Sequence, residues 1–211
     1  MNDAGPWRWD IRAQLMECVA VQRRTAECCD EMILAAARLI AESLAQGGKL
    51  MLCGNGGSAA DCQHIAAELV GRMDGRQRPA LPALALTTDT SALTALANDF
   101  GYETVFRRQV EALGQPGDVL VAISTSGRSD NVLHAVAAAR SLGVSSVALT
   151  GEGGGPLAGL ADIGVRVPSS DTQRIQEAHI AIGHVICYLV ERLLVDGGEK
   201  RVECPTGQTS G

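Results

Sequence analysis

The feature that most constrains the fold is a repeated alternation of short apolar runs with longer segments of helical periodicity. The apolar runs lie at 50–53, 82–87, 118–123, 144–149 and 162–167. Helical segments lie at about 58–72, 90–97, 103–113, 129–142 and 171–194. A glycine-rich stretch, TGEGGGPLAG, follows the fourth run, and we expect a loop there. This alternation predicts an α/β fold with a five-stranded, doubly wound parallel sheet flanked by helices.

Two additional helical segments precede the first predicted strand, at 7–27 and 29–46. The sequence QGG that ends the second is typical of a helix C-cap. The domain already has helices to cover its sheet, so we expect the extra helices to pack on the domain and on other subunits. The predicted parts of the chain are N-terminal helices (1–48), one α/β domain (49–195) and a flexible polar tail (196–211).

Composition excludes several classes of function. The net charge is −6 and no run of Lys or Arg stands out, so we expect neither a nucleic-acid partner nor binding to an anionic membrane surface. The apolar stretches are shorter than a membrane span, and no signal peptide is visible. The cysteines are odd in number, seven, and form no CxxC pair, which favours reduced, buried thiols in a cytoplasmic protein.

The first predicted strand leads into the glycine-rich sequence GNGGSAAD at 54–61. A strand, a glycine turn and a helix N-terminus together favour binding of a phosphate group. GNGGSA matches the dinucleotide pattern G-x-G-x-x-A, but that site also needs an acidic residue at the end of the second strand. Asp74 lies before that strand and Asp89 lies too far along the chain. No lysine follows the glycines, so a nucleoside triphosphate is also disfavoured, and a smaller phosphate ligand fits better.

A second loop of small polar residues, STSGRSDN at 124–131, follows the third predicted strand. Its hydroxyl groups stand beside the free amides of a helix N-terminus, and together these groups can hold a terminal phosphate without lysine. Taken alone, the sequence is also compatible with an ordinary turn and a serine cap. Two such loops at the carboxyl ends of parallel strands predict one loop for a phosphate and one for the hydroxyls of a sugar.

Ionisable side chains on two helical segments suggest a chemical centre. His64 and Glu68 are four residues apart, so they share one face of a helix. Such a pair is often a surface ion pair, but its neighbours in CQHIAAELV are mostly apolar, and a carboxylate there needs a partner or a metal. The last helix carries Gln176, His179 and His184 among apolar residues. Spacing alone leaves ion-pair, core and zinc-ligand interpretations open.

Four sequence blocks, in order, resemble the SIS (sugar isomerase) domain family and, within it, the phosphoheptose isomerases. The blocks are LCGNGGSAADCQHIAAELVGR, ANDFGYE, ISTSGRSDNV and RIQEAHIAIGHV, and the resemblance extends over roughly 30–195. It implies an aldose–ketose isomerase that converts D-sedoheptulose 7-phosphate to D-glycero-D-manno-heptose 7-phosphate through an enediol. It also implies the first step in making activated heptose for lipopolysaccharide, capsule or related glycans, and a homotetramer with active sites at subunit interfaces.

The resemblance also implies roles for individual residues. Glu68 and His184 are the implied acid/base pair. One zinc ion per site would be held by His64, Glu68, Gln176 and His184. Contacts with the substrate, either its phosphate or its hydroxyls, are implied for Asn55, Gly56, Gly57, Ser58, Arg72, Asp99, Ser124, Thr125, Ser126, Ser129 and Gln176. Two of these residues also have a purely structural interpretation. Arg72 is compatible with an exposed helix end, and Asp99 with a turn.

Two other functions are compatible with the sequence. The first is a non-catalytic SIS protein that binds a sugar phosphate or a partner such as a replication initiator, although such a protein has no need of an acid, a base and a metal set together. The second is an isomerase of another sugar phosphate, such as arabinose 5-phosphate, since pocket depth would decide between them.

Overall fold

The computed structural model describes residues 5–73 and 78–195, so the predicted tail at 196–211 lies outside the described residues. The strands are β1 (Leu50–Gly54), β2 (Ala83–Ala85), β3 (Val119–Ile123), β4 (Ser145–Gly151) and β5 (Ile163–Val167). The helices are α1 (Gly5–Cys28), α2 (Asp30–Ala45), α3 (Gly57–Val70), α4 (Thr90–Phe100), the 3-10 turn η1 (Tyr102–Thr104), α5 (Val105–Leu113), α6 (Asp130–Ser141), α7 (Gly155–Leu160) and α8 (Thr172–Val195).

The five strands form one sheet in the order β2-β1-β3-β4-β5, and every neighbouring pair is parallel, as predicted. The strand order reverses direction between β1 and β3, which are paired from Leu50 with Val119 to Gly54 with Ile123. In open parallel sheets, ligands bind beyond the carboxyl ends of the strands at such a reversal. The two small-residue loops leave the sheet at this place, after β1 and after β3.

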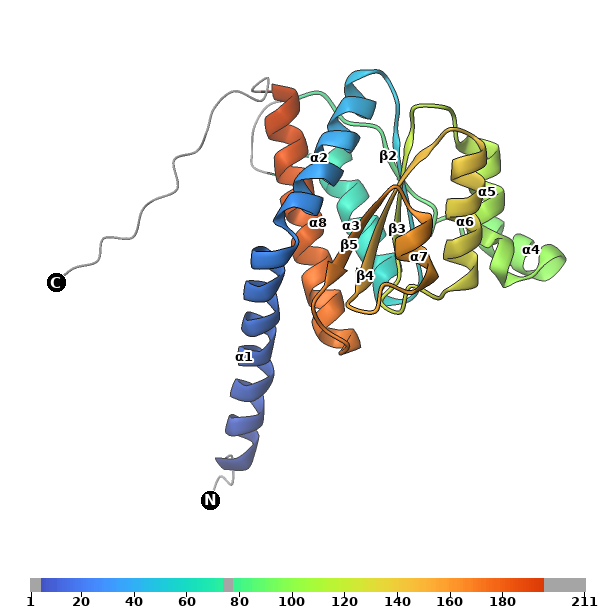
Figure 1. Cartoon of the computed structure of the whole chain (residues 1–211). Helices are drawn as coiled ribbons and strands as arrows, with labels where there is room; N and C mark the ends of the chain where they lie inside the picture. Colours follow the sequence, from blue (N-terminus) through green and yellow to red (C-terminus); the bar gives the residue numbers. More distant parts are fainter. Residues whose placement is uncertain (1–4, 74–77, 196–211) are drawn as a thin grey trace.

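Helices cover both faces of the sheet (Figure 1). Alternate residues of a strand face opposite sides, so Leu50 and Leu52 join the core shared with α2, α3 and α8, whereas Met51 and Cys53 join the core shared with α5, α6 and α7. All five residues of β1 and of β3 are buried. This burial on both faces explains why the central strands read as continuous apolar runs in the sequence.

Three elements differ from their predicted form. The glycine-rich stretch after β4 is not all loop, because α7 begins at Gly155, with a proline at its first helical positions, where a missing amide costs no hydrogen bond. The second strand is shorter than predicted, since only 83–85 pair with β1 at the edge of the sheet. The segment at 103–113 begins with the 3-10 turn η1 before α5.

The long helix α8 differs from the expectation that every apolar stretch is shorter than a membrane span. By length and composition, α8 is the one helix in the described part of the chain that passes the criteria for a membrane span. It packs against α2 and α3, and its buried side chains include Ile175, Ile182 and Val190. These contacts are those of a helix in the core of the domain.

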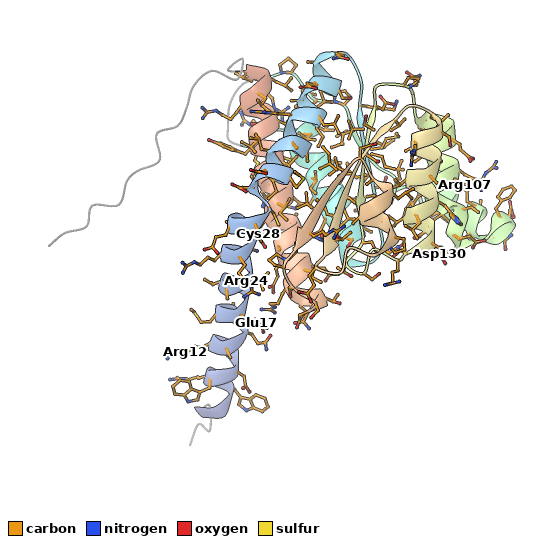
Figure 2. All side chains as sticks on the ribbon, in the orientation of Figure 1. Arg12, Glu17, Arg24, Cys28, Arg107 and Asp130 are labelled. Carbon is orange, nitrogen blue, oxygen red and sulfur yellow. The ribbon has the colours of Figure 1, made fainter. Side chains whose placement is uncertain are left out.

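The first helix extends away from the rest of the molecule (Figure 1). Arg174 donates to the carbonyl of Gln14, and Arg24 donates to the carbonyl of Pro168, so these bonds fix the direction of α1. Figure 2 shows its side chains, with Arg12 and Glu17 labelled along it. Large apolar side chains on α1 are mostly exposed: Trp7, Trp9, Ile11, Leu15, Met16 and Val19.

The cysteines partly follow their prediction. Those described are all free thiols. Four are buried, and burial raises the pKa of Cys53 and Cys187 to about 12. Cys18 is half-buried, and Cys28 is exposed on α1, contrary to the expectation of burial, because only one narrow face of this helix packs on the domain. Cys204 lies outside the described residues.

Candidate active site

The loop after β1 is fastened to the loop after β3 by a pair of side-chain amides. Asn55 and Asn131 exchange two hydrogen bonds of 2.9 Å, and Asn131 is buried at the start of α6. The hydroxyl of Tyr102 also donates to the Asn55 carbonyl oxygen, at 3.0 Å. The main chain has no spare room here, because a Cβ on Gly54 would lie 3.0 Å from the carbonyl oxygen of Ile123. The glycine-rich loop is therefore held beside the serine-rich loop.

The serine-rich loop has the form of an anion cradle. The Ser124 and Ser129 hydroxyl oxygens lie 3.0 Å apart, and Ser129 precedes α6 without making a side-chain cap. The loop turns at Gly127, whose φ of +63° favours glycine. A Cβ there would lie 2.0 Å from the carbonyl oxygen of Gly154, so the segment before α7 supports the loop from behind. Hydroxyls and helix-terminal amides are thus gathered without a lysine.

Helices α3 and α8 lie side by side and run in the same direction. Near the start of α3, a Cβ on Gly57 would lie 2.8 Å from the Gln176 amide nitrogen. Further along, a Cβ on Gly183 would lie 2.6 Å from Ile65 Cδ1, so glycine allows the helices to approach closely. Because the helices are parallel, two residues that lie equally far beyond Gly57 and Gln176 are close together. His64 is seven residues beyond Gly57 and His184 is eight beyond Gln176, so the two histidines meet.

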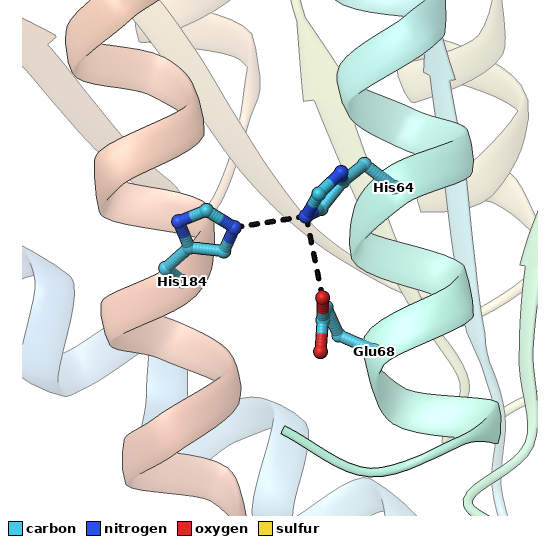
Figure 3. Close-up of side chains that lie close together, drawn as sticks. All are labelled: His64, Glu68 and His184. Atoms are coloured by element: carbon cyan, nitrogen blue, oxygen red, sulfur yellow. Dashed lines mark hydrogen bonds and ion pairs between the residues drawn. The ribbon is translucent and has the colours of Figure 1, made fainter. Parts of the chain in front are cut away.

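His64, Glu68 and His184 form a compact triangle between these helices (Figure 3). The Nε2 atoms of His64 and His184 are 2.9 Å apart, and His64 Nε2 is 3.3 Å from Glu68 Oε1. One possible ligand atom from each residue lies within 4.8 Å of the other two. The side chain of His64 is 48% exposed and that of Glu68 25%, so the triangle is open to an incoming molecule.

The donor atoms of this triangle suit zinc. Two imidazole nitrogens and a carboxylate are the usual ligands of a catalytic zinc site, which keeps further positions for a substrate. Without a bound cation, two Nε2 atoms at 2.9 Å require one ring to donate to the other, whereas a cation between them would accept both lone pairs. Gln176 lies on the same helix as His184, near the start of α3.

A further carboxyl group, that of Asp61, lies close enough to the triangle to affect its charge. Asp61 lies one turn before His64 on α3, and its Oδ2 atom is buried without a hydrogen-bond partner. Burial raises the pKa of the Asp61 carboxyl, while His64 and His184 act to lower that pKa. Asp61 thus adds negative charge close to the two imidazoles.

The other predicted site residues are placed as follows. Ser58 is buried in the first turn of α3, next to the exposed Gly56 and Gly57. Thr125 and Ser126 lie in the serine-rich loop, where the Ser126 hydroxyl accepts from the amide of Arg128. Arg72 is exposed just after α3. Asp99 is exposed near the end of α4, where it accepts from the side chain of Asn98.

Three neighbours of the site were not singled out from the sequence. Tyr102, Asn131 and Asp61 lie inside the quoted blocks ANDFGYE, STSGRSDN and GNGGSAAD. The blocks mark the right segments, but only the folded structure shows that the first two support Asn55 and that the third lies near the imidazoles.

Comparisons with known proteins agree with this architecture. The SIS domain profile matches residues 15–151. The chain is 54% identical to a phosphoheptose isomerase of Roseiflexus sp. over 90% of this chain and 95% of the relative. The solved phosphoheptose isomerase of Neisseria gonorrhoeae matches with a TM-score of 0.82 and 44% identity, over 88% of this chain and 98% of that one. That of Francisella tularensis has a TM-score of 0.84 and 38% identity, over 87% and 97%.

Proposed function

Because this chain belongs to the SIS domain family and is an isomerase of heptose phosphates, as its homologues indicate, we propose that it converts D-sedoheptulose 7-phosphate to D-glycero-D-manno-heptose 7-phosphate. The observation that carries the proposal is the triangle of His64, Glu68 and His184, two members of which lie on the helix that begins at the glycine-rich loop. A carboxylate and an imidazole at one open place provide a base and an acid for moving a proton between neighbouring carbons.

The proposed reaction moves one proton between C1 and C2 and leaves the overall oxidation state unchanged. The Glu68 carboxylate takes a proton from C1 of the ketose, and His184 gives a proton to the C2 oxygen, which forms an enediol. A proton then leaves the C1 oxygen and a proton returns to C2, which gives the aldose. Both groups end in their starting protonation states, as a catalyst requires.

We propose that His64, Glu68, Gln176 and His184 can also hold one zinc ion. Zinc, when bound, polarises a carbonyl as a Lewis acid and stabilises negative charge on oxygen. A carboxylate or imidazole bound to a metal does not exchange protons freely. In our proposal, ligation and proton transfer therefore alternate at Glu68 and His184.

Two loops and the triangle would share the binding of one sugar phosphate. The serine-rich loop, with Ser124, Thr125, Ser126 and Ser129, would hold the phosphate, and Asn55 and Ser58 would contact hydroxyls between the two ends. Along α3, seven residues separate Gly57 of the glycine-rich loop from His64, which is about 10 Å of helix. Hydroxyls bound at this loop and a carbonyl at the triangle would therefore belong to different parts of one substrate.

The direct test is to incubate the purified chain with sedoheptulose 7-phosphate and follow the aldose by NMR, with arabinose 5-phosphate tested in parallel. Turnover of the heptulose phosphate supports the proposal. Turnover of the pentose phosphate alone would contradict the proposed substrate. Binding of the heptulose phosphate without any turnover would favour the alternative, a non-catalytic SIS protein. Elemental analysis of protein purified without a polyhistidine tag measures the zinc.

We further propose a homotetramer in the cytoplasm whose product enters the synthesis of activated heptose for lipopolysaccharide, capsule or related glycans. The exposed apolar side chains of α1 support a subunit interface, since large apolar surfaces of this kind mark interaction sites. The absence of a basic run in the sequence supports a small-molecule ligand rather than nucleic acid.

A further inference from the structure

A buried arginine lies where α3 ends and the chain turns toward β2. The Nε and Nη2 atoms of Arg78 lie 2.7 and 2.5 Å from Oε1 of Glu191, a residue of α8. Both side chains are only 2% exposed. The same Glu191 oxygen accepts from the amide of Met73, at 3.1 Å. Two segments distant in the sequence are thus joined by a dry ion pair.

Two further donors of Arg78 bind the last turn of α3, and a third binds the carbonyl of Pro79. Nη2 donates to the carbonyl oxygen of Glu68 at 2.9 Å, and Nη1 donates to that of Leu69 at 2.8 Å. The final carbonyls of a helix have no partner within the helix, so the guanidinium satisfies that of Glu68 and shares that of Leu69 with the amide of Leu81. One planar group therefore connects the turn that carries Glu68 to the helix that carries His184.

This connection lies where it can set the distance between the residues of the triangle on α3 and His184 on α8. Glu191 lies seven residues, or about two turns, beyond His184, on the same side of α8. A buried ion pair is a poor means of stabilisation, because apolar residues of similar size often serve as well or better. A buried pair that also bonds the carbonyl of Glu68 can instead fix where that residue sits.

We propose that Arg78 and Glu191 are positioning residues that hold Glu68 and His64 at the distance from His184 that metal binding and proton transfer require. This inference rests on the proposed function. Arg78 touches neither substrate nor metal in this account. It acts through the main chain of α3.

The test must separate positioning from simple stability. Arg78→Met leaves Glu191 buried and unpaired, so this single variant is expected to lose both stability and zinc affinity. The double variant Arg78→Met/Glu191→Met removes both charges and should regain part of the melting temperature that the single variant loses, although the main-chain groups of Glu68, Leu69 and Met73 still lack these side-chain partners. It should still bind zinc at least about ten-fold more weakly, because the bonds to Glu68 and Leu69 are gone. Its kcat should fall while its KM stays within about two-fold, since the serine-rich loop is untouched.

The control is another ion pair, between the partly exposed Lys49 and the buried Asp118, whose Nζ and Oδ2 atoms are 2.5 Å apart just before β1 and β3. Asp118→Asn should lower the melting temperature and leave zinc affinity and kcat close to those of the wild type. Arg78→Lys keeps the charge but cannot bond Glu191 and both carbonyls together, so it should show a partial loss. This conservative variant serves if the methionine variants do not fold.

Wild-type zinc affinity or wild-type kcat in a folded Arg78→Met/Glu191→Met or Arg78→Lys protein would overturn the inference. Failure of the proposed function gives a different result, in which the wild type neither binds zinc nor isomerises. In that event, crystals of the same variants decide the matter without a metal. The inference predicts that the His64 and His184 Nε2 atoms, 2.9 Å apart in the native chain, move apart. An unchanged separation contradicts it.

Discussion

At the scale of single residues, the proposed reaction depends on Glu68 and His184 exchanging protons with a substrate. Glu68→Gln keeps the size of the side chain and removes the base, so kcat should fall by about 10²–10⁴-fold, the usual contribution of a positioned acid or base. His184→Asn should lower kcat by a similar factor. Initial rates of aldose formation measure both. His134→Asn is the control, because His134 lies on α6 against the carbonyl of Glu103, outside the triangle. Near wild-type rates in either site variant would remove that residue from the acid/base pair.

A second residue-scale prediction concerns His179, which is fully buried on α8 and hydrogen-bonded to the carbonyl of Thr150. Burial lowers the pKa of His179 to about 4, whereas an unfolded histidine titrates near 6.5. Between these values the unfolded state binds more protons, so stability is lost as pH falls through 6.5 toward 4. The expected loss from His179 between pH 7 and pH 5 is about 2 kcal/mol.

Urea unfolding at the two pH values measures this loss. His179→Gln keeps a donor for Thr150 and removes the titration, so its stability should depend less on pH by about the same 2 kcal/mol. An equally steep pH dependence in this variant would contradict the assignment.

At the scale of elements, the spacing of α3 and α8 is set at Gly183. An added Cβ would lie 2.6 Å from Ile65 Cδ1, and Ile65 is buried, so Gly183→Ala must push the helices apart or distort the side chain. We expect a loss of about 1–3 kcal/mol in unfolding free energy and weaker zinc binding. Ile65→Val in the same protein removes the closest atom and should restore part of both. Gly159→Ala, where a Cβ meets no atom within 4 Å, is the control. Unchanged zinc affinity in Gly183→Ala would show that spacing here is unimportant.

Local sequence patterns predict some of the elements and not others. The buried strands β1 and β3 were predicted because apolar runs of this length between helices have few other interpretations. The helix α7 was not predicted, because the glycines at 153–155 give the segment the composition of a loop. Periodicity also does not show that α3 and α8 are parallel neighbours with His64 and His184 at the same height. That relation follows from long-range contacts such as Gly57 with Gln176.

At the scale of the whole molecule, α1 presents apolar side chains that the described domain does not cover. Leu15 and Val19 are 63% and 55% exposed, one turn apart. If α1 packs on other subunits, Leu15→Glu with Val19→Glu should reduce a tetramer to smaller species, because burying two charges in an apolar interface is costly. Light scattering on the wild type should give four times the 22.0 kDa chain mass. A wild-type mass of one chain would contradict the proposed assembly.

The site as a whole could be predicted only in part. Spacing placed His64 and Glu68 on one helix face, and the family resemblance added His184, which the structure brings within 2.9 Å of His64. The supports of the site, Tyr102 and Asn131 around Asn55 and Arg78 at the end of α3, could not be predicted. Their contacts join segments separated by dozens of residues, and no local pattern encodes such contacts.

A crystal structure of the Glu68→Gln protein with sedoheptulose 7-phosphate bound tests the proposed reaction most directly. We expect the phosphate on the serine-rich loop, and C1 and C2 between residue 68 and His184, each side chain within hydrogen-bond reach of those carbons or their oxygens. A ketose bound in full with C1 and C2 far from both side chains would contradict the proposed reaction.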